Sequence, residues 1–383
     1  MLNVIKKILL LGPIWFLQRL LQGFISPTSK IGKKVKLFFY YLFHPLIFLN
    51  NFFLRYFSLN FSRDHTLNVV YDLNFNPISF DFSYFMACAE AYAKMHKKDH
   101  IHLWIIRPNR EKVPFSKIKN LEYESIINID SQEWRINNMI IPIVHICSSV
   151  TQYSVVREAA DVQKQFLNNT MFPEGYGPMS KPCLSYDYIF SMLAEYNFWG
   201  FKSSNQAKIF VQNWLDSENI SSKIISITIR DYGFDSLRNN SFQTWIDFAD
   251  YLEIQGYKVI FIPDTENCWD SKYKDIEQNY FSEICWNLEL RTAFYELCEL
   301  NYFYSSGLSS LALLNKNTRV ISMTPIIEDS REATSAIIES YDPDQSHNPF
   351  KYNKLYQWTL FKTDTYENLI EDFARYKKLH LDA

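Results

Sequence analysis

Glycine is scarce in this sequence, with 9 among 383 residues, and the glycine-rich signatures of several enzyme classes are missing with it. The chain has no G-x-x-x-x-G-K, no G-x-G-x-x-G and no G-x-S-x-G pattern. These absences disfavour an ATPase, a dinucleotide-dependent oxidoreductase and a hydrolase with a nucleophile elbow. Low-complexity tracts and internal repeats are also lacking, which disfavours a linker or a disordered scaffold.

The sequence also lacks a recognisable metal-binding motif. The 6 cysteines are scattered without a C-x-x-C pair, which is typical of reduced thiols in the cytosol rather than of a zinc site or a disulfide framework. His96, His100 and His102 lack the spacing of a metal site, and we interpret them as surface residues. The D-x-D sequence at residues 342–344 is interpreted as a proline turn. We therefore expect no metal and no cofactor.

Acidic residues are absent from residues 1–63, which carry nine Lys or Arg. The remaining residues hold 30 basic and 42 acidic side chains, so this arm has a charge of +9 and the body a charge of −12. An acidic body disfavours duplex nucleic acid as a partner, because neutralising phosphates requires a basic face.

The arm contains two apolar runs, residues 1–24 and Leu37–Leu54, and no small-residue cleavage site follows the first. We predict that residues 1–63 form a helical segment that lies on, or re-enters, the cytoplasmic face of the plasma membrane. Its basic side chains would meet anionic headgroups there, with aromatic rings at the interface. The alternative is a helical pair packed on the body.

The body reads as strands alternating with helices, which predicts an α/β protein with parallel sheets in two Rossmann-like domains. We place the first domain at residues 64–205 and the second at 206–350, with a C-terminal helix in 351–383 that crosses back onto the first. In the first domain we expect strands at Leu67–Tyr71, His102–Ile106, Ser125–Ile129 and Met139–Ile146, helices at Phe82–Met95 and Val150–Phe166, and a Pro/Gly loop at Thr170–Pro182.

The second domain has a clearer pattern. We expect helices at Ala207–Leu215, Leu288–Leu300 and Leu308–Leu314, one beginning near Phe242 after an N-cap at Asn239 or Ser241, and strands at Ile224–Ile229, Lys258–Ile262, Tyr302–Tyr304 and Arg319–Met323. Asp364 and Glu367 predict a capping box for the last helix.

Charged and polar residues gather where these strands end, at the edge where open α/β sheets bind ligands. Arg230 follows the first strand of the second domain, and with Arg238 it is placed to bind a diphosphate through bidentate hydrogen bonds. The alternative for Arg230 and Asp231 is local ion pairing. Further candidates are Tyr232 and Asn239 in the same loop, Asp264 and Glu266 after the next strand for ribose, Arg291, and the turn of Ser305, Ser306 and Gly307 for phosphate or sugar hydroxyls.

Carboxylates in the first domain are candidates for a general base. Asp72, Asn74 and Asp81 lie in the loop after its first strand, and Glu174 lies in the Pro/Gly loop. Transfer of a sugar to a hydroxyl acceptor requires a carboxylate or histidine within hydrogen-bond reach of that hydroxyl. We choose Asp72 first and Glu174 second.

The segments ISITIRDYGFDSLRNNS, WIDFADYLEIQGYKVIFIPDTE and LCELNYFYSSGLSSLALLNKNTRVISM resemble bacterial glycosyltransferases of the GT-B type, the heptosyltransferase-like and fucosyltransferase-like enzymes of surface polysaccharide assembly. The resemblance covers roughly residues 206–325. It implies a nucleotide-sugar donor on the second domain, a glycan or lipid-linked acceptor on the first, and no obligatory metal. The alternatives are a polysaccharide pyruvyl transferase-like enzyme and a non-catalytic GT-B-fold membrane partner in a glycan assembly complex.

Overall fold

The computed structural model describes residues 65–108, 129–163, 170–176, 184–233, 235–268, 270, 279–330, 333–335 and 352–382. The predicted arm 1–63, nearly all of the predicted strand Ser125–Ile129, and the turn at 342–344 lie outside the described residues. The described residues fall into two compact units. The first unit lies within Met1–Asn76, Tyr92–Ser116 and Thr151–Ile189, and the second within Pro77–Ala91, Lys117–Val150 and Phe190–Ala383.

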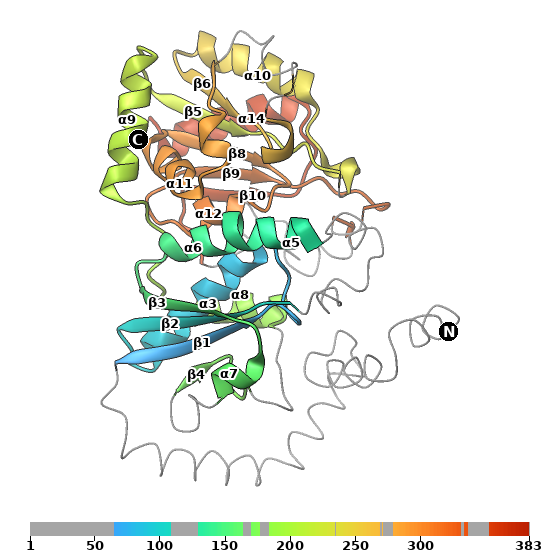
Figure 1. The fold of residues 1–383 in the computed structure, drawn as a ribbon. Helices are drawn as coiled ribbons and strands as arrows, with labels where there is room; N and C mark the ends of the chain where they lie inside the picture. Colours follow the sequence, from blue (N-terminus) through green and yellow to red (C-terminus); the bar gives the residue numbers. More distant parts are fainter. Residues whose placement is uncertain are drawn as a thin grey trace. The chain divides into compact units, whose positions relative to one another are not determined.

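The first unit is built on a sheet of order β3-β2-β1-β4, in which β1 pairs in parallel with β2 and with β4. The chain starts at β1, moves outward through β2 to β3, and returns to the other side of β1 (Figure 1). The strands are β1 (Thr66–Asp72), β2 (His100–Ile106), β3 (Val150–Val156) and β4 (Met171–Phe172).

Apolar side chains hold this sheet together. Val70, Trp104, Ile106, Val162 and Tyr176 form one buried cluster, which includes a residue of α7 (Ala159–Gln163). All but one residue of β1 are buried, as expected for a central strand covered on both faces.

The second unit contains a six-stranded parallel sheet of order β10-β9-β8-β5-β6-β7. The chain starts at the central β5, moves outward to β7, and returns to β8 on the other side of β5, which is the Rossmann order. The strands are β5 (Ile224–Thr228), β6 (Lys258–Ile262), β7 (Asn279–Tyr280), β8 (Leu300–Tyr304), β9 (Val320–Met323) and β10 (Gln357–Leu360).

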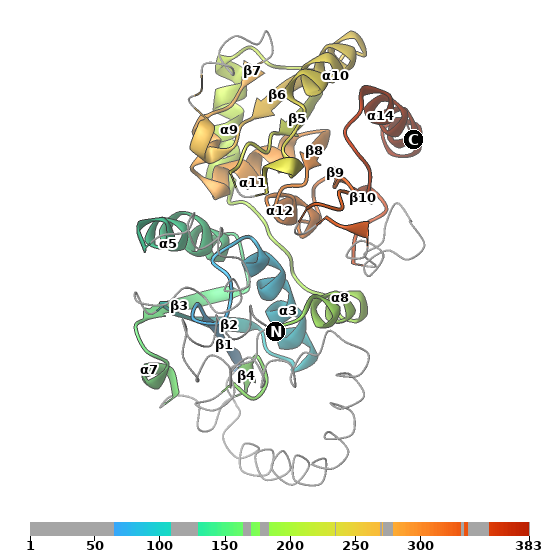
Figure 2. The same ribbon diagram turned by 90° about the vertical axis from the view of Figure 1, so that its right-hand side faces the viewer.

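Helices cover both faces of this sheet (Figures 1 and 2). On one face lie α10 (Phe242–Ile254) and α14 (Tyr366–His380), and on the other lie α9 (Asn205–Ser217) and α11 (Leu288–Leu297). Because both faces are covered, the strands are apolar along nearly their whole length. This is why the sequence pattern located them.

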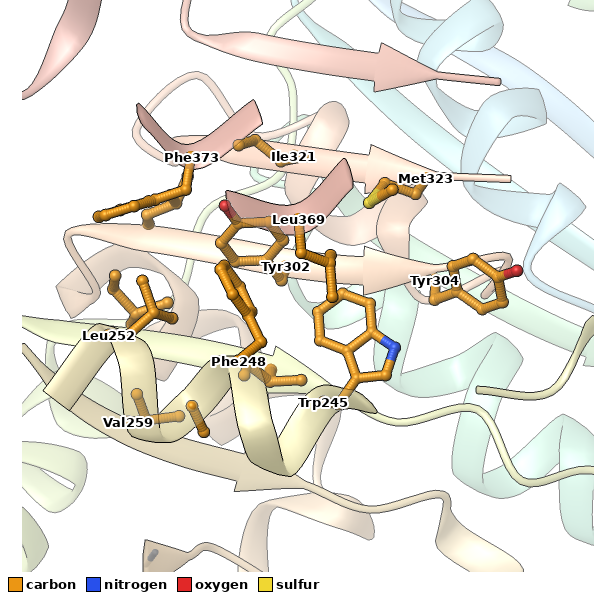
Figure 3. Close-up of a cluster of buried hydrophobic side chains, with 14 of the residues drawn as sticks. Trp245, Phe248, Leu252, Val259, Tyr302, Tyr304, Ile321, Met323, Leu369 and Phe373 are labelled. Carbon is orange, nitrogen blue, oxygen red and sulfur yellow. The ribbon is translucent and has the colours of Figure 1, made fainter. Parts of the chain in front are cut away.

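The core under α10 and α14 is rich in aromatic rings. Figure 3 shows Trp245 and Phe248 of α10 pointing toward Leu369 and Phe373 of α14, with Tyr302 of β8 between them. The rings of Phe248 and Tyr302 meet edge to face with centroids 5.3 Å apart. This packing fixes α14 on the second sheet, whereas the sequence led us to expect a helix that crosses back onto the first domain.

The predicted strand Met139–Ile146 is wrong. The segment is helical, as η2 (Ile136–Ile140) followed by α6 (Ile141–His145), with Pro142 tolerated in the first turn of α6. The buried residues Ile136, Met139, Ile140, Ile143 and Val144 recur at helix spacing. The segment from Met139 to Ile146 taken alone is almost entirely apolar, so the helical spacing of its buried residues cannot be seen in it.

The predicted helix Val150–Phe166 is also wrong in its first half. Residues Val150–Val156 form β3, an edge strand with an exposed Tyr153, and only Ala159–Gln163 is helical. Half-exposed edge strands carry mixed polar and β-branched residues, and this mixture also resembles the surface of a helix.

Two helix starts are resolved by the structure. Ser241 is the N-cap of α10, without a side-chain cap hydrogen bond. Thr365, rather than Asp364, caps α14, because its Oγ1 accepts from the backbone N of Asn368 at 3.3 Å. Among the described residues, the structure has no helix that is long and apolar enough to span a membrane.

Candidate functional site

The candidate site of the second unit lies between the carboxyl ends of β5 and β8, where the order in which the chain adds strands to the sheet reverses. Open α/β sheets bind ligands at this switch point. Arg238, in the loop after β5, donates from Nε to Ser305 Oγ at 2.8 Å and from Nη2 to Ser305 O at 3.2 Å. Ser305 directly follows β8, so this side chain bridges the two strand ends that define the switch point.

Arg230 is buried and is held within its own loop. Its Nη1 donates to Asn239 Oδ1 and, at 3.1 Å, to Asp235 O. Asn239 also closes the loop by donating from Nδ2 to Tyr232 O at 3.2 Å. The predicted donor residues Arg230, Tyr232, Arg238 and Asn239 are thus brought together, but Arg230 braces the loop.

The guanidinium groups of Arg230 and Arg238 repel each other electrostatically. Burial, followed by the positive charge of Arg238, lowers the pKa of Arg230 to about 10. The negative charge of Asp235 opposes this lowering of the pKa, and its Oδ2 lies 3.8 Å from Arg238 Nη1. The backbone of Asp235 is left-handed, with φ 53°. Two crowded cations at a switch point favour binding of an anion with two negative groups.

The carboxyl end of β6 holds the other predicted donor residues. Asp264 is half-buried, and the side chain of Glu266 lies outside the described set. Arg291 is not a surface donor, because it is fully buried beneath this edge and donates from Nη2 to Pro263 O at 3.2 Å. The pKa of Arg230 is lowered by burial and by Arg238, and the negative charge of the Asp264 carboxylate partly opposes this lowering. Asp264 is therefore a negative charge within electrostatic reach of Arg230.

The turn after β8 differs in one respect from the sequence prediction. We expected this turn to bind phosphate or sugar hydroxyls, which its backbone N–H groups would do if they were free. The N–H of Ser305 instead donates to Met323 O at 2.6 Å, and that of Ser309 donates to Ser306 O at 3.1 Å. Ser305 has a left-handed φ of 48°, which is uncommon outside glycine. The hydroxyl of Ser305 accepts from Arg238 Nε.

The first unit has a switch point of its own, between β1 and β4. Asp72 ends β1 with 1% of its surface exposed, and its Oδ2 accepts from the hydroxyl of Tyr176 at 2.8 Å. Its Oδ1 accepts from the backbone N of Asn74 at 3.0 Å and from Asn74 Nδ2 at 2.9 Å. Asp72 therefore holds this edge together, whereas Glu174 in the loop after β4 is exposed.

No family model and no curated protein matches the chain. The structural neighbours are glycosyltransferases. A glycosyl transferase family 9 protein of Veillonella parvula DSM 2008 matches with 13% identity and a TM-score of 0.41, over 82% of this chain and 89% of that one. The E. coli ADP-heptose lps heptosyltransferase II matches with 9% identity and a TM-score of 0.42, over 83% and 99% of the two chains. The E. coli heptosyltransferase WaaC with ADP matches with 10% identity and a TM-score of 0.35, over 82% and 98%.

The sequence analysis named Asp81 among the carboxylates of the first domain but chose Asp72 and Glu174 ahead of it. Asp81 begins α3 (Asp81–Met95), and the preceding Phe80 lies against the turn after β8. A Cβ on Gly307 would lie 3.1 Å from Phe80 Cβ. Residues 77–91 thus belong with the second unit, which brings Asp81 near the turn of Ser305. A contact between residues over 200 positions apart leaves no signal in a single sequence.

Arg135 is a residue that the sequence analysis missed. It ends α5 (Ile129–Arg135), donates from Nη2 to the hydroxyl of Tyr232 at 2.5 Å, and lies over the Tyr232 ring.

Among the described residues, no group of three or more His, Cys, Asp or Glu is arranged to hold a metal ion.

Proposed function

We propose that the chain is a glycosyltransferase that moves a sugar from a nucleotide-sugar donor to a lipid-linked or polysaccharide acceptor. The observation that carries this proposal is the arginine pair at the β5/β8 switch point, where Arg238 is held by Ser305 and Arg230 by its own loop. A diphosphate is the anion that two adjacent guanidinium groups suit best, because each can donate two parallel hydrogen bonds.

In the reaction, the bond between the sugar's anomeric carbon and the diphosphate oxygen breaks, and the acceptor oxygen bonds to that carbon. The nucleoside diphosphate leaves with an additional negative charge. Arg230 and Arg238 would stabilise this charge as it develops, which lowers the barrier without a metal ion. Asp264, after β6, would accept a hydrogen bond from the ribose hydroxyls, as acidic residues at that position do in Rossmann sheets.

The acceptor hydroxyl must lose a proton to a base. We assign this role to Asp81, because it directly follows Phe80, which lies against Gly307 in the turn of Ser305. Both carboxylate oxygens of Asp72 already accept hydrogen bonds, so its role is to hold the β1 edge. Glu174 is exposed at the same edge and is our second candidate for the base.

We also propose that the protein acts at the cytoplasmic face of the plasma membrane. The +9 charge of residues 1–63 supports this location, since basic and apolar side chains together bind anionic leaflets. Such a location would bring the enzyme to a lipid-linked acceptor.

The proposal is tested by calorimetric titration of the full chain with ADP, GDP, UDP and CDP, followed by a turnover assay that measures release of the diphosphate. We expect at least one nucleotide to bind, and Arg238→Gln to weaken that binding roughly tenfold, the loss expected for a charged hydrogen bond. Asp81→Asn should keep the nucleotide affinity but lose most of the turnover, because it cannot take the acceptor proton.

The matched control is Arg375→Gln, which removes an arginine on α14 that lies over the Trp358 ring. This variant should bind the nucleotide as the wild type does. Absence of binding by all four nucleotides would contradict the enzyme and favour the non-catalytic partner. Loss of turnover in Glu174→Gln, with Asp81→Asn fully active, would move the base to Glu174.

A further inference from the structure

The carboxyl edge of the second sheet presents its polar groups in a spatial order. Arg238 and Ser305 lie at the ends of β5 and β8, Asp264 follows β6, and Trp286 follows β7 at the edge. Neighbouring strands are about 4.8 Å apart, so β7 lies roughly 10 Å from β5. A nucleoside diphosphate with its diphosphate at the arginine pair and its ribose at Asp264 would therefore extend its base toward β7.

An exposed pair of aromatic rings lies on that side. Trp286 and Trp134, which we call the tryptophan pair, meet edge to face with centroids 5.7 Å apart and an interplanar angle of 80°. Their residues remain 46% and 36% exposed, respectively. Large exposed aromatic side chains often mark binding sites, because covering them releases apolar surface from water.

Hydrogen bonds fix both sides of the pair in place. Trp286 Nε1 donates to the Sγ of the buried Cys268 at 3.4 Å. Next to Trp134 in the chain, Arg135 donates to the hydroxyl of Tyr232, in the loop that also holds Arg230. The tryptophan pair is thus tied to the same loop as the diphosphate site. A platform that is ordered before the ligand binds loses little side-chain entropy on binding.

We propose that the tryptophan pair is the stacking platform for the nucleobase of the donor. This inference rests on the proposed function, since it takes the diphosphate site as given. Every nucleobase has a π-face that stacks on an indole ring, so the platform would supply affinity for the nucleoside without choosing among bases. The platform would let the protein bind nucleotide donors more tightly than ligands that carry phosphates without a base.

The test uses the full chain and its Trp286→Ala variant in calorimetric titrations with ADP, GDP, UDP, CDP and inorganic pyrophosphate. For the nucleotides that bind the wild type, we expect affinity to fall roughly 5- to 150-fold, as for loss of one base-stacking contact. Pyrophosphate should bind both proteins equally, because it reaches only the arginine pair. Trp134→Ala should change affinity in the same direction, and Trp286→Phe should recover most of the loss.

The matched control is Tyr366→Ala, which removes an aromatic ring of similar exposure, 37%, from the start of α14. It should leave all affinities unchanged. Equal weakening of nucleotide and pyrophosphate binding by Trp286→Ala would overturn the platform. Nucleotide binding that Trp286→Ala leaves unchanged contradicts the platform alone. A wild-type protein that binds no nucleotide contradicts the proposed function, and the platform with it.

Discussion

Arg230 braces the loop after β5, and under the proposed function it would also bind an anion. Its side chain donates to Asp235 O and Asn239 Oδ1, which keeps the loop after β5 closed. Its pKa is lowered to about 10, first by burial and then by Arg238, so its charged form is less favourable in the folded protein than in the unfolded chain. The resulting penalty on the free energy of unfolding is full below pH about 10 and shrinks as the pH rises above that value. A bound diphosphate would offset this penalty.

If Arg230 binds the diphosphate as proposed, nucleotide affinity should depend on pH. Above pH about 10 the free protein loses the Arg230 charge, so nucleoside diphosphate affinity should fall in that range, by at most about tenfold per pH unit. An unperturbed arginine would keep its charge there. The measurement is the dissociation constant between pH 8 and 11, and Arg230→Gln should show a weaker dependence. An identical dependence in both proteins would contradict a role for the Arg230 charge.

At the scale of elements, α14 is the helix that completes the second unit. Leu369, Phe373 and Tyr376 are buried in the core that α10 shares, and the hydroxyl of Tyr376 donates to Tyr356 O at 2.6 Å. Asp364, just before the helix, accepts from Trp245 Nε1 at 2.7 Å. The residue expected as a cap therefore anchors α10, and Thr365 caps α14 instead.

The cap can be tested by urea unfolding. Thr365→Ala should lower the free energy of unfolding by about 1 kcal/mol, because the N–H of Asn368 loses its side-chain acceptor. The control is Glu367→Ala, which removes the other half of the expected capping box and should change stability by less than about 0.5 kcal/mol. A larger loss for Glu367→Ala than for Thr365→Ala would restore the capping box at Asp364 and Glu367.

At the scale of the whole molecule, charge is divided between a +9 arm and a −12 body. An acidic body is repelled by an anionic membrane, so attachment would depend on residues 1–63. Each Lys or Arg near an anionic surface contributes about 1 kcal/mol, and this contribution falls with ionic strength.

Co-sedimentation with vesicles tests the arm. The full chain should sediment with vesicles that contain anionic lipid, and a variant that lacks residues 1–63 should stay in the supernatant. Replacing Lys33, Lys34 and Lys36 with Gln should weaken binding in part and reduce its salt dependence. Vesicles of neutral lipid alone serve as the control. Undiminished sedimentation of the shortened variant would refute a membrane role for the arm.

The sequence by itself determined most elements of the second unit and the edge on which its polar residues gather. Strands β5, β6, β8 and β9, and helices α10 and α14, lie where the apolar pattern predicts them, within a few residues. The physical reason is local: a strand covered on both faces must be apolar along its length, and the polar residues that follow it mark its end. Arg230, Arg238 and Asp264 were found by this rule.

The tertiary structure decided which strand ends are neighbours. The order of the sheet makes β5 and β8 adjacent, so that Arg238 meets Ser305, 67 residues away. It also decided that Phe80 lies against Gly307 and that Trp134 meets Trp286. These contacts join segments far apart in the chain, and no local propensity encodes them, because each depends on how the whole sheet and its helices pack.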